Sequence, residues 1–377
     1  MLPNIRAVGF VHFKSIDRPP LHRYGDAPLI MLLAGAVLAS PASAQTESAK
    51  LSTEIERSRN ILRGLSGSPL GKDEAPRLEG LLTAVESLIE KQHAKAAIET
   101  MSSAIPGIAG LRRASTGWDD SNPGTGKGIE ALTKEWEEVG RALQLARPGF
   151  PVATQAGESS FVRALAEQSV GQIDEQYAVA VDYGRISGAS AGAYYLGRAE
   201  GHLAWALFLS GLPKDSVKDA LTLPSLGMPL AALEEDIVSA YAKHGSTSQH
   251  GNFIIANSSL KLARELDQKG WRLGALITMT RSRLAWALAT MPSPSTDQEK
   301  ALAAAIDAIE ARLAGSRKDQ SIGAALVEKA RLALEKSQAG GDSAGYERLR
   351  AAALAGVVLP SYLEIVGMDP IEEGSKK

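Results

Sequence analysis

The second half of the chain repeats one pattern, in which long segments with helical periodicity are separated by short polar breaks. The segments cover residues 229–244, 251–269, 271–291, 296–314, 319–338 and 342–356. Their apolar residues recur three and four positions apart, which is typical of amphipathic helices. Short breaks between long helices place neighbouring helices antiparallel. The pattern therefore predicts an array of antiparallel helical hairpins.

The composition favours the same fold class. Aromatic residues make up only 5% of the chain, whereas Ala and Leu recur throughout. Ala and Leu are strong helix formers, and sheets favour β-branched and aromatic residues. We therefore expect an all-α protein, built either as an α-solenoid or as a compact helical bundle. One ambiguous segment is YAVAVDY, residues 177–183, which alternates like a strand.

One hairpin, near residues 260–280, resembles a tetratricopeptide repeat. The residues that fit the small and large positions of that family are Leu262, Ala263, Leu266, Gly270, Ala275 and Met279. The sequence departs from the family pattern at Ser282 and Ala287, where the family prefers Ala and Pro. The resemblance implies a helical-hairpin scaffold of the protein-binding kind, without catalytic residues.

The N-terminus has the pattern of a secretory signal peptide. Basic residues precede the apolar run Ala27–Ala39, and small residues follow at positions 42–44. We expect cleavage after Ala44 and a periplasmic or secreted protein. The chain contains no cysteine, so an exported form is held together without disulfides. No later segment is apolar and long enough to predict a membrane span.

The expected organisation has four parts. Residues 1–44 are the signal peptide, 45–127 an N-terminal helical unit with a loop, 128–358 the helical-hairpin array, and 359–377 a loosely ordered tail. The boundary near 127 rests on residues 106–128, which are rich in Gly, Ser, Asp and Pro. Trp118 is expected to be solvated in this loop. The formal net charge of −2 argues against nucleic acid as a partner.

The five letters LAWAL occur twice, at residues 203–207 and 284–288. Residues on a helix advance by about 100° each, so the two Leu share a face and the Trp points to the opposite side. A helix that is apolar on both sides contacts neighbours on both sides. We therefore expect both LAWAL helices to lie in the middle of packed layers.

The helix expected at residues 189–210 carries a second stripe beside its leucines. This stripe is a candidate site for a ligand or partner, because Arg can bind an anion while aromatic rings stack on a planar group. The alternative is a contact between helices. Its residues are Tyr194, Tyr195, Arg198, His202 and Trp205. Three glycines in the same helix, Gly192, Gly197 and Gly201, suggest close approach by another helix or a ligand.

A single carboxylate, Glu200, lies on a different side of this helix from the stripe. A carboxylate on a helix that is apolar nearly all round must reach water or a partner. We expect Glu200 to pair with a basic residue on a neighbouring helix, with Arg281 as the first candidate, since it aligns with Glu200 when the two LAWAL segments are superposed.

The pentad GASAG, residues 188–192, resembles the nucleophile elbow of patatin-like lipases. The resemblance implies a serine hydrolase with Ser190 as nucleophile, and it requires YAVAVDY to be the preceding strand. The glycine-rich oxyanion loop and the Asp-Gly motif of that family are absent. His244 and His250 lack a third metal ligand nearby, so neither a metal nor a cofactor is expected.

Taken together, these patterns favour an exported, non-enzymatic helical scaffold that binds a protein or a cell-envelope component. The first alternative is a serine hydrolase that uses Ser190. The second alternative is a small-molecule binding protein that uses the stripe of aromatic, Arg and His residues.

Overall fold

The computed structural model describes residues 47–65, 69–121, 126–146, 159–212, 219–244 and 249–368. All regular structure in these ranges is helical, and the backbone pairing between Asp219 and Lys318 is an isolated bridge. The expectation of an all-α fold is confirmed. The predicted signal peptide, residues 1–44, lies outside the described residues.

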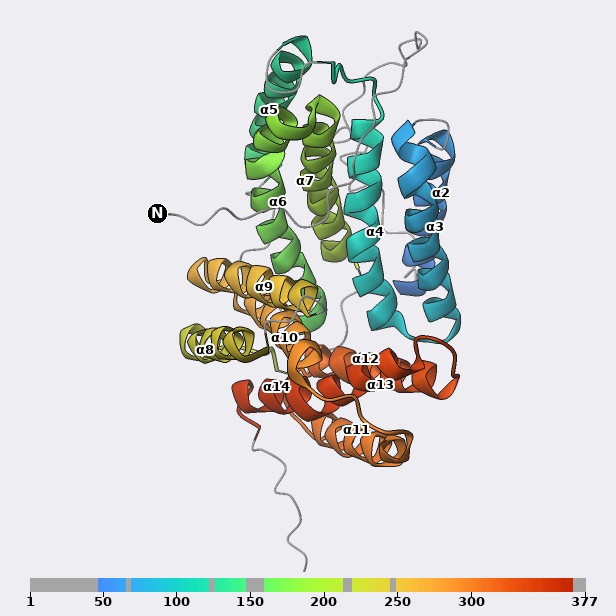
Figure 1. The fold of residues 1–377 in the computed structure, drawn as a ribbon, viewed down its shortest axis with the longest axis vertical. Coiled ribbons are helices and arrows are strands. Elements are labelled where there is room, and N and C mark those ends of the chain that lie inside the picture. Colours follow the sequence, from blue (N-terminus) through green and yellow to red (C-terminus); the bar gives the residue numbers. More distant parts are fainter. Residues whose placement is uncertain are drawn as a thin grey trace, which may run out of the picture.

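The helices form two sets. Figure 1 shows α2 to α7 along the long axis of the molecule, with α8 to α14 lying across their lower end. Neighbours in the chain pack as hairpins, most extensively α6 with α7 and α9 with α10. The bounds are α2 Glu47–Leu65, α3 Pro69–Glu90, α4 Ala94–Ala114, α5 Lys127–Ala146, α6 Ser160–Ser187, α7 Ala189–Ser210, α8 Gly227–His244, α9 His250–Gln268, α10 Arg272–Thr290, η2 Thr296–Gln298, α11 Glu299–Ala314, α12 Ser321–Gln338, α13 Ala344–Ala353, η3 Leu354–Val358 and α14 Leu359–Ile365.

The segment YAVAVDY is part of α6, so the strand-like interpretation is wrong. Strand pairing needs a partner to complete the backbone hydrogen bonds, and the described residues contain no strand beside it. A helix satisfies those bonds internally. Its buried residues Ile173, Ala180 and Gly184 recur at helical spacing and face α5 and α7.

The loop expected from residue 106 begins only after Ala114, because α4 continues through Pro106. The apolar residues Ile105, Ile108 and Leu111 keep the helical spacing beyond the proline and are buried. The expectation that Trp118 is solvated is also wrong. Its side chain is buried, and its indole N–H donates a hydrogen bond of 2.8 Å to the carbonyl of Arg113.

The tail expected from residue 359 begins with an ordered helix. Leu359, Tyr362 and Leu363 on α14 are buried in the core. A π-helical segment, η3, joins α13 to α14. A π turn widens the helix just before Pro360, which lacks an N–H and would clash with the carbonyl four residues earlier. Tertiary packing therefore carries the helix beyond the proline.

One hydrophobic core extends from Leu51 on α2 to Val366, which directly follows α14. A second cluster joins Trp118 to α5, α6 and α7. Residues from both sides of position 127 contribute to each cluster: the larger one runs from α2 to α14, and Trp118 joins the second.

Several helices are capped at their N-termini by acidic side chains distant in sequence. A carboxylate there satisfies a free backbone N–H and complements the positive end of the helix dipole. The hydrogen bonds measure between 2.5 and 2.9 Å. They run from Ala96 N to Glu328, Ser160 N to Asp319, Ser190 N to Asp120, Leu226 N to Asp267 and Gly274 N to Glu167.

The helix α7 lies between α4 and α6, as Figure 1 shows, and glycines bring it close to both. A Cβ added at Gly192 would lie 2.5 Å from the carbonyl oxygen of Ala180 on α6. A Cβ at Gly197 or Gly201 would lie 2.5 Å or 2.6 Å from the α4 backbone. The close approach expected from these glycines is therefore an approach of helices.

We predict that Gly201→Ala destabilises the protein by about 1–3 kcal/mol, because the added methyl overpacks the α4–α7 contact. The matched control is Gly80→Ala on α3, where a Cβ meets nothing within 4 Å. That change should stabilise the protein by up to about 1 kcal/mol, since Ala is the better helix former. Urea unfolding measures both. Equal effects of the two variants would contradict the packing.

Candidate functional site

The first LAWAL segment lies in the middle of a packed layer, as expected. Leu203 belongs to the cluster shared with α5 and α6, whereas Trp205 belongs to the larger core and stacks on Phe208 with ring centroids 4.9 Å apart. The second segment also contacts both sides. Leu288 packs near the π segment, and the half-buried Trp286 donates to the carbonyl of Asp236 on α8 at 3.3 Å.

The predicted stripe on α7 is divided by depth. His202 and Trp205 are buried, whereas Tyr194, Tyr195 and Arg198 are partly exposed. Tyr194 and Arg198 pack against Gly110 of α4, whereas Tyr195 faces α6. The stripe therefore lies between α4 and α6, with its polar end toward the surface and Trp205 in the core.

The tyrosines of the stripe form an aromatic group that joins α7 to α6. Tyr195 stacks on Tyr183 of α6, with ring centroids 4.2 Å apart and planes 28° apart. Tyr194 meets Tyr195 edge-on at 5.8 Å, and the guanidinium of Arg198 lies 5.8 Å from the Tyr194 ring centre. Burial, together with the neighbouring Tyr183, raises the pKa of Tyr195 to about 12.

The deeper part of the stripe holds buried polar atoms without hydrogen-bond partners. These atoms are Nε of Arg198, Nδ1 and Nε2 of His202, and Nε1 of Trp205. Oε1 of Gln176 on α6 is also buried without a hydrogen-bond partner. Burial, with a smaller contribution from the charge of Arg198, lowers the pKa of His202 to about 3, so the imidazole is neutral at physiological pH.

Gln176 is the residue that the sequence analysis missed. Because α6 and α7 are antiparallel, the Tyr183–Tyr195 stack fixes their register. Gln176 lies seven residues, about two helical turns, before Tyr183, and His202 lies seven residues after Tyr195. The two residues therefore lie at the same level of the α6–α7 contact. Only the register between the helices could have revealed that they share this level.

The charged pair on the other side of α7 differs from the one expected. Glu200 is buried and pairs with Arg113 of α4, which donates from Nε at 3.0 Å and from a terminal nitrogen at 2.8 Å. Arg113 also contacts Glu135 of α5. The expectation that Glu200 pairs with a basic residue on a neighbouring helix is confirmed. The expectation that this residue is Arg281 is wrong, because Arg281 is exposed on α10, whereas α4 packs closely against α7.

Arg113 holds its charge although it is largely buried. Burial alone would lower the Arg113 pKa, but the hydrogen bonds and charge of Glu200, with the charge of Glu135, outweigh it and raise the pKa. The ion pair therefore connects α4, α5 and α7 through one guanidinium.

A double-mutant cycle tests this pair. We predict that Glu200→Gln destabilises the fold by about 3 kcal/mol, because it leaves the Arg113 charge in a partly buried site. The double change with Arg113→Met should then cost less than the sum of the single changes, by about 2 kcal/mol. Arg281→Met is the control, and it should show no coupling to Glu200→Gln in denaturant unfolding. Coupling to Arg281 alone would contradict the pairing.

Ser190 lies in the first turn of α7, directly after α6 and a single glycine, Gly188, with φ +104°. The segment before it is helical, so the strand that a nucleophile elbow requires is absent and this resemblance is not supported. The backbone N–H of Ser190 donates to Asp120. The small residues of GASAG accommodate a helix start packed closely against α5 and α6.

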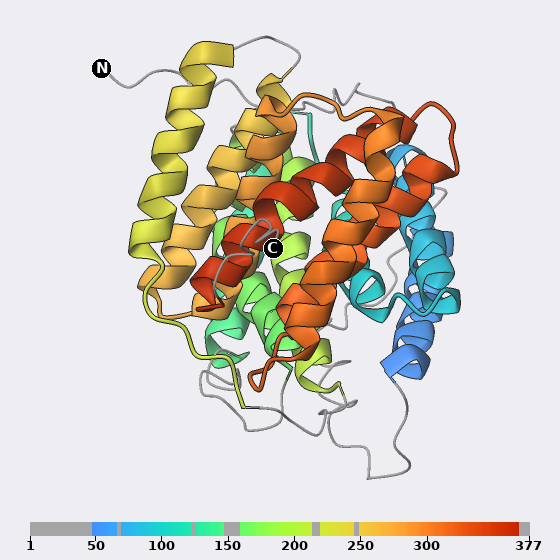
Figure 2. The ribbon, with the colours of Figure 1, turned by 90° about the horizontal axis from the view of Figure 1, so that it is seen from below.

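The outer face of α8 is exposed and largely apolar. We call this surface the α8 face, and it consists of Met228, Ala231, Ala232, Glu235, Val238, Ser239 and Ala242. Met228 is 86% exposed and Val238 is 64% exposed. The opposite side of the helix is buried through Leu230, Leu233 and Ile237. Figure 2 shows α8 at the edge of the molecule, with α9 on one side only.

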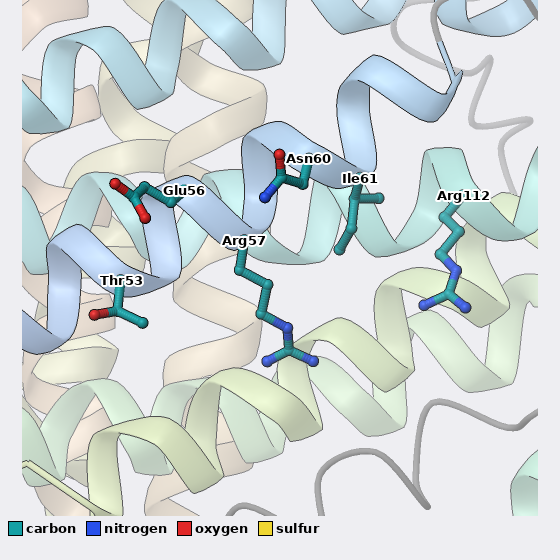
Figure 3. A pocket seen from close by; sticks show the side chains of 6 residues that line it. All are labelled: Thr53, Glu56, Arg57, Asn60, Ile61 and Arg112. Atoms are coloured by element: carbon teal, nitrogen blue, oxygen red, sulfur yellow. The ribbon is translucent and has the colours of Figure 1, made fainter.

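A shallow hollow of about 540 Å³ lies between α2 and α4. Figure 3 shows its side chains, with Arg57 of α2 and Arg112 of α4 extending on the same side of α2. Glu56 also lines the hollow, and Arg57 contacts Glu54 at 3.4 Å. Both signs of charge therefore meet here, which favours no single class of ligand.

Within the described residues, no three His, Asp or Glu side chains are grouped so that they could hold a metal ion. In the same part of the chain, no helix combines the length and apolar character that a membrane crossing requires. Comparison of the chain with family models, curated proteins and solved structures finds no match. The likeness of α9 and α10 to a tetratricopeptide hairpin thus remains a resemblance.

The depressed pKa of His202 predicts a pH dependence of stability. In the folded protein the His202 imidazole takes up a proton only near pH 3. In the unfolded chain the same imidazole is protonated below about pH 6.5. The contribution of neutral His202 to the free energy of unfolding is therefore complete above pH 6.5 and is lost as the pH drops toward 3. The loss amounts to about 2 kcal/mol between pH 6.5 and 5.

The change His202→Gln should remove this part of the pH dependence, and His250→Gln at an exposed position of α9 should leave it intact. Thermal unfolding of both variants at pH 7 and pH 5 measures it. An unchanged dependence in His202→Gln would contradict the buried neutral imidazole.

Proposed function

We propose that the protein is an exported, non-enzymatic helical scaffold that binds another protein through the α8 face. The observation that supports this proposal is the exposure of large apolar side chains along one side of an edge helix. Met228 and Val238 expose most of their surface, with alanines between them. Contiguous exposed apolar surface on a globular protein is typical of interaction sites.

The spacing on the α8 face fits a helical partner. Met228, Ala231, Val238 and Ala242 form a ridge, because they are separated by three, seven and four residues. Such a ridge packs against the apolar stripe of an amphipathic helix, whose own anchors recur with the same period. The predicted occupant is therefore an amphipathic helical segment of a partner protein.

The charge on the α8 face specifies the partner further. Glu235 lies within the face, and the exposed Asp236 borders it. A partner helix with Lys or Arg beside its apolar stripe complements these carboxylates. The same charges oppose an anionic membrane surface. They also oppose a second copy of the chain, because Glu235 is near the middle of α8 and antiparallel pairing would place two such carboxylates together.

A photo-crosslinking amino acid at position 238 tests the proposal in the organism's envelope. We predict a discrete adduct with a partner whose crosslinked peptide is an amphipathic helix with basic flanks. The matched control is the same amino acid in place of Leu145, which is 83% exposed on α5 and lies outside the α8 face. The control should give no such adduct.

The charge complementarity is tested with Glu235→Lys in the chain that carries the crosslinker at position 238. Repulsion from the basic flanks should lower the adduct yield at least about tenfold, since like charges across an interface cost several kcal/mol. An adduct with a second copy of the chain, an equal yield at position 145, or no adduct at all would each refute the proposal.

A further inference from the structure

We propose that the flank of α7 between α4 and α6 is a binding site for a small organic acid that also carries a hydroxyl or amino group. We call this flank the α6–α7 site, and it consists of Gln176, Tyr183, Tyr194, Tyr195, Arg198, His202 and Trp205. It is independent of the α8 face, which lies in the other set of helices.

The first argument is the convergence of unpartnered polar groups. Gln176, His202 and Trp205 are at least nine-tenths buried, and each has a polar atom without a hydrogen-bond partner. Buried polar groups in native proteins are nearly always paired, and an unpaired one destabilises the fold. Apolar side chains of similar size would avoid that cost. The concentration of such groups on one flank therefore points to a ligand that pairs with them.

The second argument is the gradient from surface to interior. Arg198 is partly exposed while its Nε is buried, and His202 and Trp205 follow one and two turns deeper along α7. The aromatic group of Tyr183, Tyr194 and Tyr195 stands at the exposed end. A ligand bound at Arg198 would therefore have aromatic faces beside it and unpaired polar atoms deeper along α7.

The third argument is charge. Among the described residues, Arg198 is the one charged group that acts on His202, and the carboxylate of α7, Glu200, points to the opposite side and is held by Arg113. Within this part of the chain, the flank therefore carries a positive charge without a neutralising acid. An arginine guanidinium in a desolvated setting binds a carboxylate through charge-assisted hydrogen bonds. A cationic ligand would be repelled.

The remaining groups define the rest of the ligand. The neutral imidazole of His202 offers one donor and one acceptor, and the unpaired Oε1 of Gln176 is an acceptor. Both acceptors need a donor from the ligand, which a hydroxyl or amino group supplies. Trp205 Nε1 adds a donor at the deep end. Hydroxy acids and amino acids combine these features, whereas simple fatty acids lack the donor.

Binding of lactate, glutamate and, as a ligand without a donor, butyrate to the mature chain tests the proposal by calorimetry. We expect lactate or glutamate to bind and butyrate to bind at least about tenfold more weakly. Arg198→Met should weaken binding at least about tenfold. Arg281→Met, at an exposed arginine of α10, is the matched control and should leave binding unchanged.

Gln176→Met separates binding from folding. This near-isosteric change removes an unpaired buried oxygen, so it should weaken binding about tenfold while leaving the unfolding midpoint of the free protein unchanged or higher. The indole N–H resonance of Trp205, assigned by its loss in Trp205→Phe, should shift on saturation with ligand. Failure of lactate and glutamate to bind, or binding that Arg198→Met and Gln176→Met leave intact, would overturn the proposal.

Discussion

The packing of α2 to α7 depends on one constraint, which is the close contact of α7 with α4 on one side and with α6 on the other. Glycines at positions 192, 197 and 201 remove the side chains that would hold the backbones apart. Each glycine costs up to about 1 kcal/mol of helix propensity relative to Ala. Packing at backbone distance offsets that cost, because more atoms of the neighbouring helices come into contact.

Electrostatic contacts then fix which helices meet. Arg113 connects α4 to α5 and α7 through Glu135 and Glu200, and acidic side chains cap helices that are distant in the chain. Asp319, just before α12, caps α6, and Glu328 on α12 caps α4. These two caps join the set α2 to α7 to the other set of helices. A protein without cysteine thus joins its two sets of helices through half-buried carboxylates in addition to its core.

The sequence predicts the helices well and their contacts only in part. Hydrophobic periodicity predicts α7 and the helices of the second half. It also predicts that Trp205 is buried, because Trp205 lies on the side of the helix opposite Leu203. The partner of Glu200 does not follow, because it depends on which helices are neighbours. Burial of Trp118, continuation of α4 through Pro106 and the helix after Pro360 are likewise decided by tertiary packing, which overrides local turn signals. Gln176 becomes visible only once the register of α6 and α7 is known.

Hydrogen exchange of the backbone amides, followed by mass spectrometry in native conditions, tests the central position of α7 most directly. A helix held on both sides opens only with the global unfolding of the protein, whereas an edge helix opens locally at lower free energy. Peptides from α7 should therefore be among the slowest to exchange, and those from α8 distinctly faster. Exchange of α7 as fast as that of α8 would contradict the account.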